Sequence, residues 1–82
     1  IHDSEIRRSG SDKALEILQS FIRQEVDVDP RYLSASLTAD RLAIKVWLAS
    51  HRGVYGVPEQ FMGMQVIVMY PTYRGFERYW AH

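Results

Sequence analysis

The chain of 82 residues contains no cysteine. This absence excludes disulfides, thiolate zinc sites and a cysteine nucleophile. The sequence also lacks an excess of charge, because ten Lys and Arg residues balance ten Asp and Glu residues. A nucleic-acid-binding domain usually carries a basic excess, so the balance disfavours nucleic acid as a partner. The three histidines fit no metal-binding spacing, and the sequence predicts neither a metal nor another cofactor.

Long apolar runs are missing as well. None reaches the roughly 20 residues that a membrane-spanning helix needs, and no signal-peptide pattern is present. We therefore expect no membrane partner and a cytoplasmic location. Because the chain begins with Ile1 rather than Met, we also expect a fragment or subunit of a larger assembly. The polar start predicts a mobile arm over residues 1–10, followed by a single small domain over residues 11–82.

Apolar residues with helical spacing follow Ser11 and Asp12, which are good N-cap residues. The pattern predicts an amphipathic helix from Asp12 to Val26. Pro30 favours an end shortly after Val26, because the residue before a proline is disfavoured in the helical region. The apolar positions of the predicted helix are Ala14, Leu15, Ile17, Leu18, Phe21, Ile22 and Val26.

Two interpretations of residues 31–52 lead to different folds. In the first, Tyr32 to Leu37 and Leu42 to Leu48 alternate as two strands around a turn at Thr38 to Arg41. In the second, Thr38 begins a helix that runs to Arg52 and serves as the recognition helix of a winged helix-turn-helix. Its basic residues would then face DNA: Arg41, Lys45 and Arg52. The concentration of Ile, Val and Trp favours the strands.

The later part of the chain predicts a loop over Ser50 to Val57 and a short helix that starts at Pro58 and ends at Gly63. A strand from Met64 to Tyr70 follows, ended by Pro71. The fold class is therefore α+β: one amphipathic N-terminal helix packed on a three-stranded, mainly antiparallel sheet, with an aromatic C-terminal tail. We expect the helix to contact the sheet through Leu15, Leu18, Phe21 and Ile22, which meet Leu42, Ile44, Val46 and Val68.

The tail carries the clearest functional signal. Aromatic residues and arginine are the types that dominate protein-binding hot spots. If the tail were helical, its rings would share one side, with guanidinium groups beside them. One alternative is that the tail packs over the sheet and completes the core; another is that its rings stack on the bases of single-stranded nucleic acid. The predicted partner-binding residues are Tyr73, Arg74, Phe76, Arg78, Tyr79 and Trp80.

Chemistry-bearing side chains also gather near the glycine-containing loop, at His51, Arg52, Tyr55 and Glu59. No nucleophile motif or paired acid accompanies them, so we interpret them as solvated loop residues and predict no catalytic residue. The sequence thus predicts a non-enzymatic protein-interaction or assembly module, with a protein partner or self-association. The alternative is a DNA-binding winged-helix domain.

Overall fold

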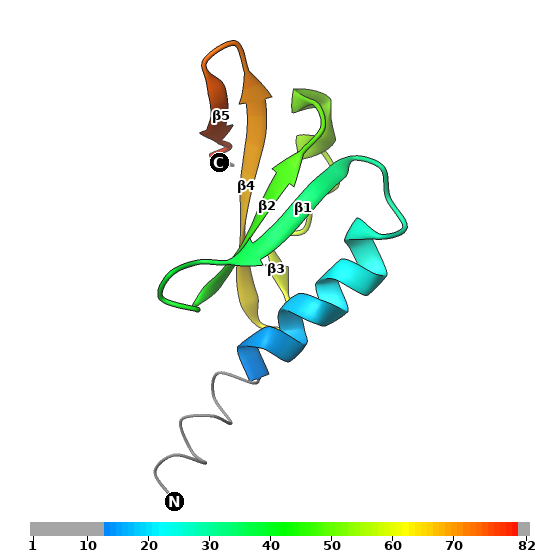
Figure 1. Cartoon of the computed structure of the whole chain (residues 1–82), viewed down its shortest axis with the longest axis vertical. Coiled ribbons are helices and arrows are strands. Elements are labelled where there is room, and N and C mark those ends of the chain that lie inside the picture. Colours follow the sequence, from blue (N-terminus) through cyan, green and yellow to red (C-terminus); the bar gives the residue numbers. More distant parts are fainter. Residues whose placement is uncertain (1–12, 81–82) are drawn as a thin grey trace, which may run out of the picture.

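The computed structural model describes residues 13–80, which form one helix and a five-stranded mixed sheet (Figure 1). The arm predicted over residues 1–10 lies outside this range. No helix within residues 13–80 has both the length and the apolar character needed to cross a membrane. The helix and the sheet confirm the predicted small α+β class. The sheet has five strands rather than three and is mixed rather than mainly antiparallel.

The N-terminal helix covers residues 13–21 and continues as one wider turn, η1 (Ile22–Val26). In that turn the amide of Asp27 donates to the carbonyl of Ile22 over 2.8 Å. The predicted end at Val26 is confirmed. The buried stripe contains Ala14, Ile17, Leu18 and Phe21, spaced i, i+3, i+4 and i+7. Leu15 lies one position off this stripe and is 42% exposed, so its predicted contact with the sheet is wrong.

Residues 32–48 form the antiparallel hairpin of the first interpretation, with β1 (Tyr32–Leu37) and β2 (Ala43–Leu48). The recognition helix of the winged-helix alternative is therefore absent.

In the connecting turn, the Asp40 carboxylate accepts hydrogen bonds from the Thr38 hydroxyl (2.6 Å) and the Leu42 amide (3.0 Å). These two bonds lower the pKa of Asp40. Leu42 belongs to this turn and is 72% exposed, so its predicted contact with the helix is wrong.

A bulge at Leu33 reverses part of the predicted alternation in β1. Tyr32 pairs with Leu48 and Ser34 pairs with Trp47, which leaves Leu33 as an extra residue. The extra residue directs the Tyr32 ring into the core and leaves Leu33 58% exposed. Strict period two over residues 32–37 would instead place Leu33, with Ala35 and Leu37, on the core side and Tyr32 on the outer side.

β4 (Met64–Thr72) is the central strand and pairs with β2 in parallel, not antiparallel, orientation. Residues 49–63 connect the two strands, and a connection of that length allows the chain to return to the same end of the sheet. β4 also continues through Pro71, where the sequence predicted its end. Residue 71 pairs with Phe76 of β5, but alternation from Val68, which accepts from Tyr79, directs the nitrogen of residue 71 toward β2. Pairing with β2 stops at Met69, so the strand tolerates this proline without loss of a ladder bond.

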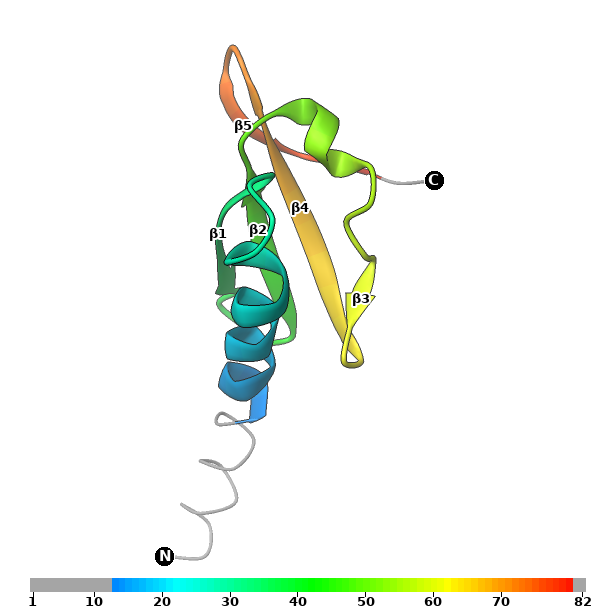
Figure 2. The ribbon, with the colours of Figure 1, turned by 90° about the vertical axis from the view of Figure 1, so that its right-hand side faces the viewer.

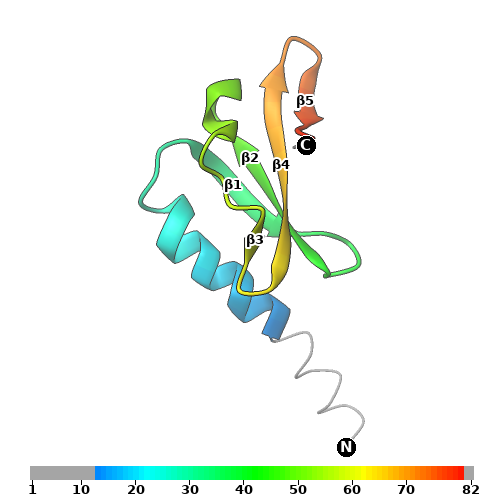
Figure 3. The ribbon, with the colours of Figure 1, turned by 180° about the vertical axis from the view of Figure 1, so that it is seen from behind.

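Two further strands pair with β4 at its two ends (Figure 3). β3 (Gln60–Phe61) replaces the short helix predicted from Pro58, and it turns into β4 through Met62 and Gly63. Both turn residues have positive φ, 52° and 84°, as the two-residue turns that match strand twist require. The tail supplies β5 (Gly75–Arg78), so it is a strand rather than a helix.

The core lies between the helix and one face of the sheet; the helix passes in front of β1 and β2 in Figure 2. Phe21 is fully buried and meets the rings of Tyr32 and Phe61 edge-on, at centroid distances of 5.6 and 5.1 Å. The helix therefore contacts β1 and β3, the first and last strands in the sheet order β1-β2-β4-β3. The buried cluster contains Ile17, Leu18, Phe21, Tyr32, Ile44, Val46, Leu48, Val66 and Val68.

Candidate interaction surface

The sheet face opposite the helix is built from the alternate residues of the same strands. Paired residues share a face, so Trp47, Met69 and Arg78 form a row across β2, β4 and β5. Lys45 and Ile67 form the next row. All five side chains are only partly buried, in contrast to their buried neighbours on the helix side. We call these five residues the open face.

Cations on this surface lie against indole rings. The Arg78 guanidinium lies 3.9 Å from the centre of the Trp80 ring, and the Lys45 ammonium lies 5.9 Å from that of Trp47. Such cation–π contacts hold a cation in place while its other donors stay available. Trp80 is 62% exposed, so a large aromatic surface extends beyond the open face.

The residues predicted from the tail do not form one cluster. Tyr73 and Arg74 occupy the turn between β4 and β5, where Tyr73 is 92% exposed. Gly75, with φ of 109°, and the Thr72 hydroxyl, which accepts from the Arg74 amide over 3.1 Å, close this turn. Phe76 pairs with Pro71 on the same side as the open face.

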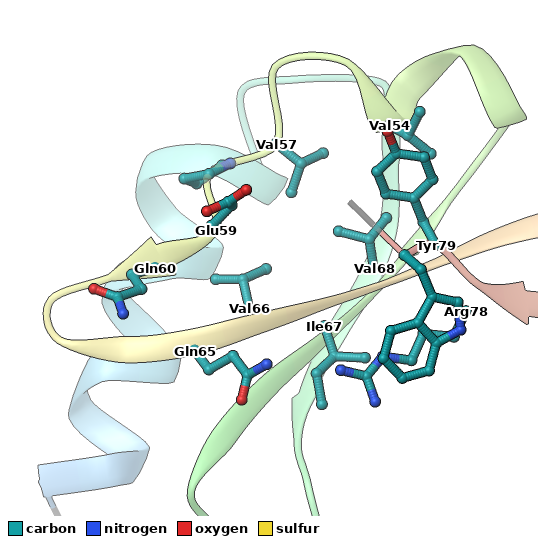
Figure 4. A pocket seen from close by; sticks show the side chains of 12 residues that line it. Val54, Val57, Glu59, Gln60, Gln65, Val66, Ile67, Val68, Arg78 and Tyr79 are labelled. Atoms are coloured by element: carbon teal, nitrogen blue, oxygen red, sulfur yellow. The ribbon is translucent and has the colours of Figure 1, made fainter. Parts of the chain in front are cut away.

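The remaining three residues, Arg78, Tyr79 and Trp80, line one side of a pocket of about 420 Å³ (Figure 4). Its floor is the stretch of β4 from Gln65 to Val68, between β3 and β5. The opposite wall comes from the segment after β2, including Val57 and Glu59. This volume lies within the range typical of small-molecule sites.

Arg31, in the turn before β1, links the pocket wall to that turn. The Arg31 guanidinium forms an ion pair with Asp29 over 2.8 Å and donates to the carbonyl of Tyr55. Tyr55 directly follows η2 (His51–Val54), a short helical turn inside the predicted loop. Gly56 has φ of 92° and lies against Arg31, where a larger side chain would meet the guanidinium. These contacts position the segment that leads to Val57.

The loop residues considered for chemistry are not brought together by the fold. His51 and Arg52 are exposed in η2, whereas Glu59 lies at the pocket, and Tyr55 is 75% exposed. Ser, Thr, Cys, Lys and His are absent from the lining residues that the structure describes. Within residues 13–80, no three His, Asp or Glu side chains are grouped as metal ligands.

Comparisons with known proteins provide no relative from which this geometry can be interpreted. The chain matches no protein-family model, and searches of curated proteins and of solved structures find no match either. The site must therefore be interpreted from its own chemistry.

Sequence reasoning missed the open face and the floor of the pocket. Alternation with Ile44 and Val46 predicts that Lys45 and Trp47 lie on the outward side of β2, but their neighbours across the sheet depend on the parallel pairing with β4. The apolar residues on both faces of this strand, such as Ile67 and Met69 opposite Val66 and Val68, predict a central strand, and β4 is central; they do not identify its neighbours.

Proposed function

We propose that this domain is a non-enzymatic protein-interaction module that binds an acidic surface of a partner protein through its open face. The observation that supports this proposal is the composition of that face. Trp47, Met69 and Arg78 form an uninterrupted row, and aromatic residues, methionine and arginine are the types enriched in protein interfaces. Within residues 13–80, the helix lies on the other side of the sheet.

Charge favours a different protein over a second copy of this chain. The ionisable members of the open face are Lys45 and Arg78, and both are cations. Two copies stacked face to face would bring these cations together, which is unfavourable. Carboxylates on a partner would instead complement both of them. Self-association is the competing possibility, and sedimentation equilibrium tests it first.

Sedimentation equilibrium on the full chain at pH 7 gives that first measurement. We expect a monomer, because like charges oppose face-to-face pairing. A dimer that dissociates when Trp47 is changed to Ala would overturn the choice of a different protein as partner.

Titration of the ¹⁵N-labelled chain with the peptide acetyl-Glu-Asp-Tyr-Glu-Asp-amide then tests the face itself. We expect the largest chemical-shift changes at the main-chain amides of the open-face residues. The changes should be smaller when Glu and Asp of the peptide are replaced by Gln and Asn. The Trp80→Ala variant removes an exposed ring beside Arg78 and should weaken binding about tenfold, which corresponds to about 1.4 kcal/mol and exceeds the cost at most interface residues. Tyr73→Ala, at the hairpin turn, is the matched control and should bind normally. Changes confined to the turn residues, or equal binding of the neutral peptide, would refute the proposal.

A further inference from the structure

The outer edge of β4 has a short gap in its hydrogen bonding, between β3 and β5. Val66 donates its amide to the carbonyl of Glu59 over 2.9 Å, and Val68 accepts at its carbonyl from the amide of Tyr79 over 2.8 Å. In an antiparallel pair each of these contacts would normally be matched by a reciprocal bond. Neither reciprocal bond forms among the described residues.

Two main-chain groups of β4 are consequently left facing the pocket. Alternation along a strand sends the amide and carbonyl of Val66 and Val68 to this outer edge, and those of Ile67 to β2. The carbonyl of Val66 and the amide of Val68 therefore have no partner within residues 13–80. Val66 and Val68 are 7% and 8% exposed, and main-chain groups at such depth are almost always hydrogen-bonded.

These two groups match one residue of an added parallel strand. A residue lying opposite Ile67 in parallel orientation would donate its N–H to the carbonyl of Val66 and accept at its carboxyl oxygen from the amide of Val68. Its neighbours in a longer chain would meet Glu59 and Tyr79, because those residues already occupy the positions opposite Val66 and Val68. The gap therefore fits one residue better than a continuous strand.

The charges at the two ends of the pocket fit the two ends of a free amino acid. In the parallel orientation the amino group points toward Glu59 and the carboxylate toward Arg78, both of which line the pocket. Neither side chain forms an ion pair within the described residues. Val54 and Val57 add to an apolar wall for a side chain, as Figure 4 shows. From this arrangement we infer that the pocket binds a free apolar α-amino acid in its zwitterionic form.

This inference does not rest on the interaction proposed for the open face, although Ile67 and Arg78 contribute to both sites. Hydrogen exchange followed by NMR tests the gap in the free chain. We expect the Val68 amide to exchange at least about tenfold faster than the Val66 amide, since only the latter has a hydrogen-bond acceptor on this edge. Equal protection of the two amides would overturn the inference.

Three small probes then separate the possible sources of the ligand: leucine, N-acetylleucine and leucinamide. Leucine retains both charges, whereas N-acetylleucine mimics the last residue of a peptide and leucinamide mimics the first. We expect leucine to slow exchange at Val68 about tenfold at saturation, and to bind at least about tenfold more tightly than either capped probe. Equal binding of N-acetylleucine or leucinamide would overturn the free amino acid in favour of a chain end. No effect of any probe at Val68 would overturn the site itself.

Variants identify the two charged contacts. Glu59→Gln should weaken leucine binding without changing the affinity for N-acetylleucine, and Arg78→Gln should weaken leucine binding without changing that for leucinamide. Glu77→Gln and Arg74→Gln change the same residue types outside the pocket lining and are the matched controls. If both controls weaken leucine binding as much as the pocket variants, general charge rather than the pocket is responsible. Because none of these measurements uses the acidic peptide, either proposal can fail without the other.

Discussion

The two faces of the sheet use the same strands and the same alternation, yet they differ in what covers them. On the helix side, Ile44, Val46 and Leu48 are fully buried. On the other side, Lys45 and Trp47 alternate with them and remain partly exposed. Burial is therefore set by the position of the helix rather than by the hydropathy of the strand. The difference implies that helix-side residues mainly stabilise the fold, whereas open-face residues are available for contacts with other molecules.

The strongest test of this division is Phe21→Ala. Phe21 is 0% exposed and contacts rings from β1 and β3, so its removal leaves a cavity at the centre of the helix side. We expect the free energy of unfolding to fall by about 3–5 kcal/mol, measured by urea denaturation. A domain of this size has little stability to lose, so partial unfolding at 25 °C is consistent with this prediction. A loss below about 1 kcal/mol would show that the helix is not the main cover of the sheet.

A matched pair of isoleucines compares the two faces directly. Ile44 is fully buried under the helix, and Ile67 lies on the open face at a neighbouring register position. Ile44→Ala should cost about 2–5 kcal/mol of unfolding free energy. Ile67→Ala should cost about 1 kcal/mol, because a half-exposed side chain loses less apolar burial. Equal costs would mean that the open face is covered in solution.

The smallest effect concerns pH. Tyr32 lies on the helix side, and burial raises the pKa of its hydroxyl, followed by the effect of the Glu25 carboxylate. The unfolded chain then releases this proton at a lower pH than the folded chain does. The stability contributed by the protonated phenol is complete below about pH 10 and is lost as the pH rises through the raised value. Denaturation of wild type and Tyr32→Phe across this range measures the loss, which should be smaller in the variant. Tyr73→Phe, at the exposed turn, should behave as wild type does.

Local sequence patterns predicted the helix and strands that depend on interactions between residues close together in the sequence. Helical spacing identified the stripe from Ala14 to Phe21, and alternation identified β1 and β2 with nearly correct ends. The hairpin turn at Thr38 was also predicted. These features depend on residues within one or two turns of each other, and propensity and periodicity report such short-range physics directly.

The errors arise where distant contacts override local preference. Met62 has positive φ although methionine does not favour it, because the pairing of β3 with β4 fixes the turn. Glycine disfavours a helix at Gly75, but no local pattern indicates that Phe76 and Arg78 pair with β4. The bulge at Leu33 likewise accompanies a distant contact, since it directs the Tyr32 ring into the core against Phe21.

The sequence alone thus determined the α+β class, the N-terminal helix and the first hairpin of this protein, because each follows from the spacing of nearby apolar residues. It also identified the tail as rich in aromatic and basic groups. The tertiary structure decided which of those groups meet. The parallel pairing of β2 with β4 creates the open face, and the separation of β3 from β5 leaves the main-chain groups of Val66 and Val68 facing a pocket. Both outcomes depend on how strands far apart in the chain share one central strand, which no local pattern specifies.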